Sequence, residues 1–240
     1  MNRLLKTLIV LGIGLSASQL SAEPGEEKSF ETSADQKLNY LLHLPKGYAD
    51  DESKKWPVML FLHGAGERGD DLAKVKVHGP PNLADADWEQ PFIVISPQCP
   101  NDQWWTWHTE TLLGLIDSVI ESHRVDEDRV YLTGLSMGGY GSWALASRYP
   151  EKFAAVAPIC GGGTPYMVRR MADLPIWVFH GAKDGVVPLS ESWRLVETLK
   201  KSGAEKVEFT IYPEAGHNSW TESYDNPKLY EWFLSHKRGE

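Results

Sequence analysis

The chain has 240 residues, of which 42 % are hydrophobic and 24 % are charged. This length and composition are typical of one globular domain of the α/β class, which often reaches about 200–250 residues. The formal net charge is −9. Because an acidic surface repels phosphate groups, we expect no nucleic-acid partner.

The first residues have the order of a cleaved export signal. Arg3 and Lys6 provide a positive start, an apolar run covers residues 7–17, and small residues follow up to Ala22. This order predicts a signal peptide over residues 1–22, with cleavage after Ser18 as the alternative, and a single domain over residues 23–240. The apolar run is short for a membrane span. We therefore expect an exported protein, periplasmic or extracellular, that is not stably inserted in a membrane after cleavage.

Short apolar segments alternate with helical patterns along the rest of the chain. The predicted strands are Leu38–Leu44, Val58–His63, Phe92–Ser96, Val130–Gly134, Phe153–Ile159, Ile176–His180 and Val207–Tyr212. The predicted helices are Thr109–Ser122, Met137–Arg148, Ser190–Lys201 and Pro227–His236. Several strands are apolar without interruption, which indicates burial on both faces of a mostly parallel sheet flanked by helices. Residues 23–35 are polar, and we expect them to be loose.

A serine follows one of these strands and precedes a helix in the segment Gly134-Leu135-Ser136-Met137-Gly138. The G-x-S-x-G spacing is typical of the nucleophile elbow of α/β hydrolases, for which the pattern is a known signature. The serine occupies a strained turn that exposes its hydroxyl, and glycines two residues away on either side avoid collisions. The pattern predicts Ser136 as a nucleophile, with an ordinary serine at a strand–helix turn as the alternative.

An acid and then a base are expected after the serine in this order of motifs. Asp184 lies in the loop after the strand Ile176–His180, and His217 lies in the loop after the last strand. We expect His217 to take the proton of Ser136 and Asp184 to orient the imidazole. Asp225 is a weaker acid candidate because it follows His217. The alternative histidines are His43, His123, His180 and His236, at strand ends or in or after helices, where histidine is more often structural.

An oxyanion hole requires two N–H donors directed at the developing charge. We expect one from Met137, which follows the nucleophile. The other should come from the small residues after the strand Val58–His63, with Ala65 preferred and Gly66 second. Glu67 and Arg68 are expected to pair and brace this loop, or to contact substrate. The alternative is a plain tight turn.

Four segments together resemble a known group of enzymes: His63–Asp70 (HGAGERGD), Pro97–Pro100 (PQCP), Gln103–Trp105 (QWW) and Gly134–Gly139 (GLSMGG). They are similar to exported esterases often labelled "predicted peptidases", a group related to polyhydroxybutyrate depolymerases and feruloyl or acetyl-xylan esterases. The resemblance implies the α/β-hydrolase fold, a Ser-Asp-His triad and ester cleavage. In that fold the strands Phe92–Ser96, Val58–His63, Val130–Gly134 and Phe153–Ile159 lie side by side in this order. That order places Cys99 and Cys160 roughly 14 Å apart, too far for a disulfide, so we expect two free thiols.

Cap domains of α/β hydrolases are usually inserted between the strands that here end at Ile159 and begin at Ile176. The intervening segment has room for about one helical turn, so we expect no cap domain and an open site. No H-E-x-x-H motif and no Cys/His cluster at zinc spacing is present in the sequence, so we expect neither metal nor cofactor.

Aromatic residues near the motifs are candidates for contact with substrate, although they are as consistent with loop packing. They are Trp104, Trp105, Trp107, Tyr140 and Trp220. The sequence thus predicts a serine carboxylic-ester hydrolase that acts through an acyl-enzyme on short-acyl, aryl or carbohydrate-linked esters. The alternatives are a serine peptidase or acyltransferase with the same triad, and a non-catalytic binding module on a hydrolase scaffold. The sequence does not indicate the oligomeric state.

Overall fold

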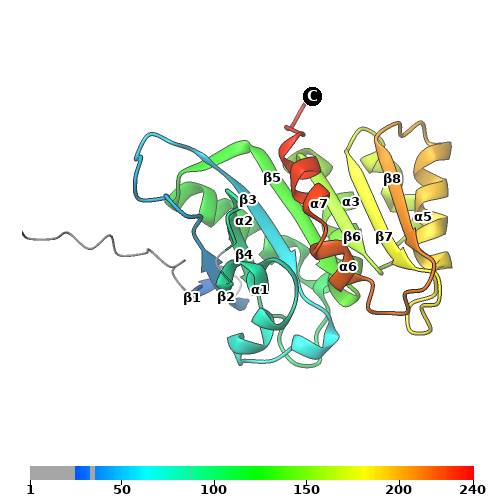
Figure 1. The fold of residues 1–240 in the computed structure, drawn as a ribbon, viewed down its shortest axis with the longest axis horizontal. Coiled ribbons are helices and arrows are strands. Elements are labelled where there is room, and N and C mark those ends of the chain that lie inside the picture. The colour runs from blue at the N-terminus through cyan, green and yellow to red at the C-terminus, as the bar shows by residue number, and fades with distance from the viewer. Residues whose placement is uncertain (1–24, 33–35, 87) are drawn as a thin grey trace, which may run out of the picture.

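The computed structural model describes residues 25–32, 36–86 and 88–240. Within them, eight strands form one sheet in the order β1-β2-β4-β3-β5-β6-β7-β8 (Figure 1). The strands are β1 (Glu26–Glu31), β2 (Lys37–His43), β3 (Trp56–Leu62), β4 (Ile93–Pro97), β5 (Val125–Leu135), β6 (Ala155–Ile159), β7 (Ile176–Gly181) and β8 (Val207–Tyr212). Strand β2 pairs antiparallel with both β1 and β4, and all other pairs are parallel. The predicted α/β fold and the order β4-β3-β5-β6 are confirmed.

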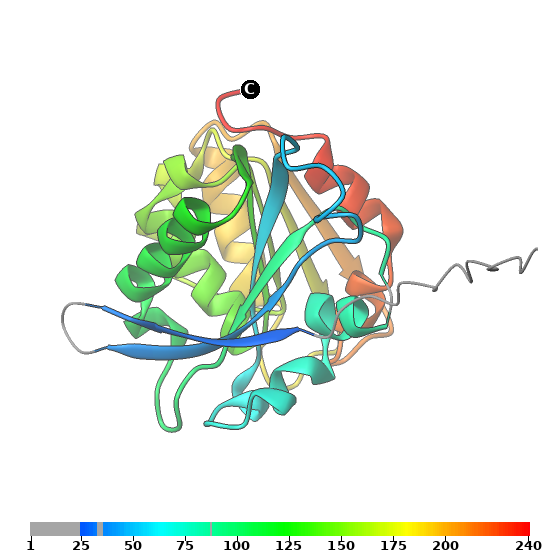
Figure 2. The same ribbon diagram turned by 90° about the vertical axis from the view of Figure 1, so that its left-hand side faces the viewer.

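Helices cover both faces of this sheet (Figure 2). They are α1 (Gly79–Asp85), α2 (Thr109–Ser122), α3 (Met137–Arg148), α4 (Pro165–Val168), α5 (Ser190–Lys201), α6 (Trp220–Tyr224) and α7 (Pro227–Leu234), with short 3-10 turns that include η1 (Ala65–Glu67), η3 (Trp105–Trp107) and η5 (Arg169–Met171). Helices α2, α3 and α5 share one hydrophobic cluster with the sheet, and α6 and α7 share the other. The predicted bounds of α2, α3 and α5 are confirmed, whereas α7 ends two residues earlier than expected.

The central strands are apolar without interruption because both of their faces are covered. Every residue of β3 is buried. Val58, Leu60 and Leu62 belong to the cluster on the α2–α3–α5 side, and Met59 and Phe61 belong to the cluster on the α6–α7 side. This alternation between two cores keeps the sheet rigid, so that the loops at its edge start from fixed positions.

The expectation of a loose segment over residues 23–35 is wrong for most of its described part. Residues 26–31 form β1, which pairs antiparallel with β2 at the edge of the sheet. An edge strand is held by backbone hydrogen bonds on one side and tolerates polar side chains. Phe30 is the one apolar residue of β1, and it packs against the core beside Gly114. The predicted leader, residues 1–22, lies outside the described residues.

The segment that joins β6 to β7 is short, as expected. Residues 160–175 contain α4 and η5 and no inserted domain. Cys99 follows β4 and Cys160 follows β6, and both are free and buried, which confirms the expectation of two thiols. None of the helices formed by the described residues has the length and apolar character that crossing a membrane requires.

Candidate active site

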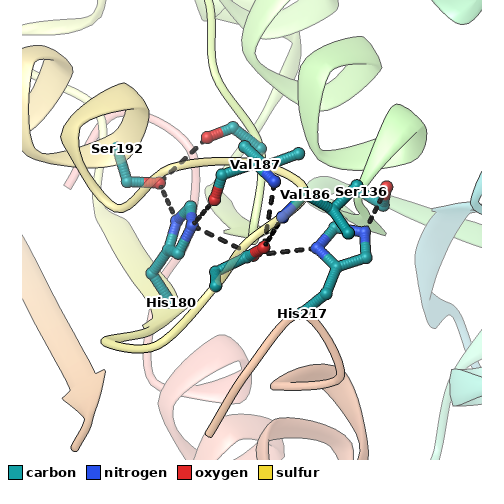
Figure 3. A network of polar contacts seen from close by, with 8 residues as sticks. Ser136, His180, Val186, Val187, Ser192 and His217 are labelled. Atoms are coloured by element: carbon teal, nitrogen blue, oxygen red, sulfur yellow. Dashed lines mark hydrogen bonds and ion pairs between the residues drawn. The ribbon is translucent and has the colours of Figure 1, made fainter.

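The loops after β5, β7 and β8 meet at the carboxyl edge of the sheet, and each carries one residue of the predicted triad. Because parallel strands end at the same edge, residues far apart in sequence converge there. The structure brings Ser136, Asp184 and His217 into one hydrogen-bonded chain (Figure 3). The strand positions thus bring together the three side chains that the sequence predicted.

Ser136 occupies a strained turn between β5 and α3. Its backbone has φ 53° and ψ −115°, a conformation that non-glycine residues adopt only when the surroundings impose it. The Ser136 N–H donates to the carbonyl of Ile159 on the neighbouring strand (2.9 Å). A Cβ atom on Gly138 would lie 1.8 Å from the carbonyl oxygen of Leu62. The start of α3 therefore presses against the end of β3, and this close approach explains the glycine two residues after the serine.

His217 links the other two residues of the chain. Its Nε2 lies 2.9 Å from Ser136 Oγ, and its Nδ1 lies 2.8 Å from Asp184 Oδ2. The Asp184 side chain is fully buried, whereas the His217 side chain is 21 % exposed. An imidazole held in this way can accept the serine proton while part of its ring remains exposed to solvent.

The carboxylate of Asp184 is held by several donors. Its Oδ1 accepts from the N–H groups of Val186 and Val187, both at 2.9 Å. Burial alone would raise the pKa of Asp184, but the hydrogen bonds from His217 and from the two amides outweigh it and lower that pKa. The carboxylate is therefore ionised across the neutral range and available to stabilise a charged imidazole.

A second histidine, His180, also contacts Asp184 (Figure 3). It is completely buried, and its Nε2 is 2.9 Å from the carbonyl oxygen of Val187 and 3.3 Å from Asp184 Oδ2. Its Nδ1 is 2.8 Å from Ser192 Oγ. The sequence predicts a structural role for His180 and does not reveal its contact with Asp184. The sequence feature that could have revealed this contact is the His-Gly-x-x-Asp spacing at the end of a strand.

The loop after β3 lies next to the elbow, where the oxyanion donors were expected. Ala65 is the first residue of η1, Gly66 follows it, and Met137 is the first residue of α3. N–H groups at the start of a helix have no partner within that helix, so those of Ala65 and Met137 are available to a ligand. A Cβ on Gly64 would lie 2.8 Å from the side chain of Leu135. The loop therefore packs against Leu135, the residue that precedes Ser136.

His63 fixes the loop after β3 through both of its ring nitrogens. Its Nδ1 donates to the carbonyl of Gly64 (2.6 Å), and its Nε2 accepts from the N–H of Cys99 (2.9 Å). Burial lowers the pKa of His63 to about 4, so the ring is neutral and each nitrogen has one partner. The imidazole ties the loop after β3 to the loop after β4.

Arg68 also braces the loop, but not by the expected pairing with Glu67. Its Nε donates to the carbonyl of Ala65 (3.0 Å), and its guanidinium reaches the carbonyl of Gln103 (3.3 Å). The carboxylate of Glu67 lies 3.9 Å from His63 Nδ1 instead. Arg68 therefore holds the carbonyl group of Ala65 directly.

The aromatic candidates divide into two groups. Trp105 is completely buried, and its Nε1 donates to the carbonyl of His63 (2.9 Å). The expectation that Trp105 contacts substrate is therefore wrong, because its large apolar ring fills the core beneath the loop. Trp104 is 43 % exposed with Arg68 near its ring. Trp220 is half-buried and meets the His217 ring edge-on, with centroids 5.3 Å apart.

A groove of about 430 Å³ runs beside α3. Tyr140, one turn after Ser136, begins its wall, and Trp143, Ala144 and Thr164 continue it. The Trp143 indole is buried and its Nε1 has no hydrogen-bond partner. Trp107 and Tyr166, both well exposed, are sequence neighbours of wall residues. The groove thus offers aromatic surface at Tyr140 and hydroxyls, and it begins one helical turn after Ser136.

Cys160, Asp184 and His217 form the one group among the described residues whose spacing would suit a metal ion, with ligand atoms within 4.8 Å of one another. Burial raises the pKa of the Cys160 thiol to about 12, so the sulfur is protonated, and a protonated thiol is a poor metal ligand. Asp184 and His217 are already hydrogen-bonded to each other. The arrangement fits proton transfer better than metal binding.

Comparisons with known proteins find esterases and related hydrolases. The family model described as "Putative esterase" matches residues 32–184, and that of the prolyl oligopeptidase family matches residues 164–238. A probable feruloyl esterase C of Aspergillus terreus is 28 % identical over 79 % of this chain and 71 % of its own length. The bifunctional acetylxylan esterase/xylanase XynS20E of Neocallimastix patriciarum is 26 % identical over 73 % of this chain, which spans only 26 % of it. A crystal structure of a thermostable esterase superposes with a TM-score of 0.80 at 35 % identity, covering 90 % of this chain and 64 % of that one.

Proposed function

The chain belongs to the family described as "Putative esterase", and we propose that it is a serine carboxylic-ester hydrolase that works through an acyl-enzyme on Ser136. Family membership and the esterase relatives support an enzyme that acts on carboxylic esters. The observation that carries the proposal is the hydrogen-bonded chain from Ser136 through His217 to Asp184, with Ser136 held at φ 53°.

The proposed reaction has two halves that use the same side chains. Ser136 Oγ attacks the ester carbonyl while His217 Nε2 takes the hydroxyl proton, and the N–H groups of Ala65 and Met137 receive the oxyanion. Collapse of the tetrahedral intermediate breaks the bond to the alcohol, which leaves with the proton from His217. Water then attacks the acyl-enzyme with His217 as base, which releases the acid and restores Ser136.

We propose short-acyl, aryl-acid or carbohydrate-linked esters as substrates. The groove beside α3 supports this choice, because Tyr140 offers aromatic surface and Thr106 and Thr164 offer hydroxyls. Aromatic rings stack on sugars and aryl acids, and hydroxyls bond their polar groups. No cap covers the carboxyl edge in the described residues, so an ester on a larger molecule can reach Ser136.

Peptide-bond cleavage by the same residues is a second candidate. The match of residues 164–238 to the prolyl oligopeptidase family favours it, and this segment contains both Asp184 and His217. Cleavage of an amide differs from that of an ester only in the leaving group, which His217 must protonate more completely. The test of function therefore has to include an amide.

Residues 1–22 are proposed as an export signal and residues 23–240 as one catalytic domain. The support is the order of charge, apolar core and small residues at the start of the sequence and the single sheet that runs through the described residues. We propose an exported protein, periplasmic or extracellular.

Hydrolysis of p-nitrophenyl acetate, butyrate and octanoate and of methyl ferulate tests the proposed function, with acetyl p-nitroanilide as the matched amide. We expect the protein to cleave esters much faster than the anilide. Ser136→Ala serves as the control, and it should abolish the activity without changing the melting temperature. Ester cleavage that survives in Ser136→Ala contradicts the mechanism. Faster cleavage of the anilide moves the assignment to a peptidase.

A further inference from the structure

His180 occupies the centre of the loop that carries Asp184. It is the penultimate residue of β7, and the loop from Gly181 to Pro188 turns around its ring. Its Nε2 faces the Val187 carbonyl at 2.9 Å and Asp184 Oδ2 at 3.3 Å, while its Nδ1 faces Ser192 Oγ on α5 at 2.8 Å. Ser192 Oγ is also 3.0 Å from the carbonyl of Gly161. The ring thus joins the end of β7 to the start of α5 and to the loop from Gly181 to Pro188, here called the acid loop, and Ser192 extends the contact to the end of β6 (Figure 3).

The partners of the ring decide where its proton resides. Both neighbours of Nε2, a carbonyl and a carboxylate, only accept hydrogen bonds, so Nε2 carries the hydrogen. Burial lowers the pKa of His180, which leaves the ring neutral and makes Nδ1 an acceptor. The Ser192 hydroxyl has a single hydrogen and lies within reach of both Nδ1 and the Gly161 carbonyl, so it donates to one of the two. In this tautomer Nε2 directs its hydrogen at the Val187 carbonyl and at Asp184 Oδ2.

We propose that His180 is a positioning residue for catalysis, whose Nε2–H orients the Asp184 carboxylate toward His217. The proposal rests on the proposed function of the triad, and it goes further by assigning a role to a residue outside the triad. Oδ2 of Asp184 accepts the hydrogen bond of His217 on one side, and His180 Nε2, whose hydrogen bond to the Val187 carbonyl is shorter, lies 3.3 Å from the same oxygen on the other. Oδ1 is held by the amides of Val186 and Val187. Without His180, only the partner that must move protons would hold Oδ2.

The surroundings of the ring contain few other titratable groups that could replace this contact. From the acid loop it faces Asp184, and from the loop after β8 it faces His217. From α5 it meets Ser192, which is uncharged and fully buried. No lysine or arginine is ion-paired with Asp184 among the described residues. The orientation of the carboxylate therefore depends on neutral N–H donors, which act only at short range and in good geometry.

The test compares two carboxamide variants, His180→Gln and His180→Asn. A glutamine amide extends to the position of Nε2, so it can donate to Asp184. An asparagine amide ends near the position of Nδ1, so it can reach Ser192 only. We expect His180→Asn to lower kcat about tenfold, the scale seen when an outer hydrogen bond to a functional ligand is removed, with KM unchanged. His180→Gln should retain most of the activity.

A spectroscopic readout separates this role from a merely structural one. The downfield proton NMR resonance of His217 Nδ1–H reports its hydrogen bond to Asp184. It should shift or broaden in His180→Asn and persist in His180→Gln. Equal kcat values and unchanged resonances in the two folded variants overturn the proposal. Should His180→Asn fail to fold, His180→Leu replaces it, with the same expected loss and the same contradicting outcome. Because the resonance needs no substrate, it tests His180 even if the wild type hydrolyses no ester.

Discussion

The two ends of the sheet are hollowed in different ways. The carboxyl end holds Ser136, Asp184 and His217 and the groove of about 430 Å³ beside α3. The amino end holds a larger hollow of about 610 Å³, between the starts of β6, β7 and β8 and the last four residues of the chain. No serine or histidine lines the larger hollow. The direction of the strands, and not the size of the hollow, therefore indicates where chemistry is expected.

The two ends also differ in how their polar groups are treated. The larger hollow is lined by solvated charges of both signs, among them Arg170, Lys206 and Glu205. The carboxyl end is built on buried neutral imidazoles, His63 and His180, whose pKa values burial lowers. Solvated charges change the stability of a protein little, and they do not fix the conformation of the loops that carry them. Buried rings are costly unless each nitrogen is paired, so they hold their loops in one arrangement.

Replacing one histidine at each end of the sheet by alanine tests whether only the carboxyl end carries out chemistry, and here we expect the largest effect. We expect His217→Ala to lower kcat for p-nitrophenyl butyrate about 10⁴-fold, because the proton of Ser136 then has no acceptor. His236 is half-buried near the amino end, close to Lys206 and Glu240. His236→Ala should leave kcat within about twofold. Steady-state kinetics of both variants provides the measurement, and comparable losses in the two would contradict the assignment of the carboxyl end.

We expect acid to lower the unfolding free energy of the protein by protonating His63, which lies at the carboxyl end of the sheet. Its pKa is about 4 in the folded protein and about 6.5 when exposed. Because the folded-state pKa is lowered, the contribution to stability is complete above about pH 6.5 and is lost as the pH falls toward about 4. Between pH 6.5 and pH 5 this loss amounts to about 2 kcal/mol of unfolding free energy.

Urea unfolding at the two pH values measures this loss. Other histidines also have lowered pKa values, so the loss of stability on acidification is compared between the wild type and His63→Gln. This variant replaces the imidazole with an amide, which does not titrate. The variant should be less stable at neutral pH, yet lose about 2 kcal/mol less than the wild type on acidification. Equal losses in both proteins would show that His63 does not carry the effect.

The sequence predicted the centre of the fold better than its edge. Uninterrupted apolar runs such as Val58–Leu62 and the helix of the elbow follow from strong local patterns. Strand β1 was missed because its Glu-rich sequence is held by backbone pairing with β2, which side-chain periodicity does not record. Helix α6 was also missed, because five residues are too few to show a periodic pattern.

The site shows a similar division. The convergence of Ser136, Asp184 and His217 could be predicted because strand order fixes which loops meet at the carboxyl edge. Trp105 was misassigned because sequence does not reveal on which side of a loop a ring lies; the structure turns it into the core against His63. The role of Arg68 at the Ala65 carbonyl was missed for the same reason. Contacts within loops depend on tertiary packing rather than on a repeating pattern.

The smallest expected effect concerns the two hollows themselves. Ala144 lines the groove beside α3, Ala172 lines the hollow at the amino end, and both are half-buried. Each can be replaced by phenylalanine, which adds the same bulk to the two walls. We expect Ala144→Phe to raise KM for methyl ferulate and p-nitrophenyl octanoate about fivefold, less than 1.4 kcal/mol of binding, with little change for the acetate.

Ala172→Phe is the matched control, and it should leave all of these KM values unchanged. Initial rates over a range of substrate concentrations measure both variants. An unchanged KM for every ester in Ala144→Phe would exclude the groove as the binding site for the larger part of the substrate. A raised KM in Ala172→Phe would instead show that the amino end participates. Because the two substitutions differ only in the end of the sheet they fill, any difference between them is due to position and not to added volume.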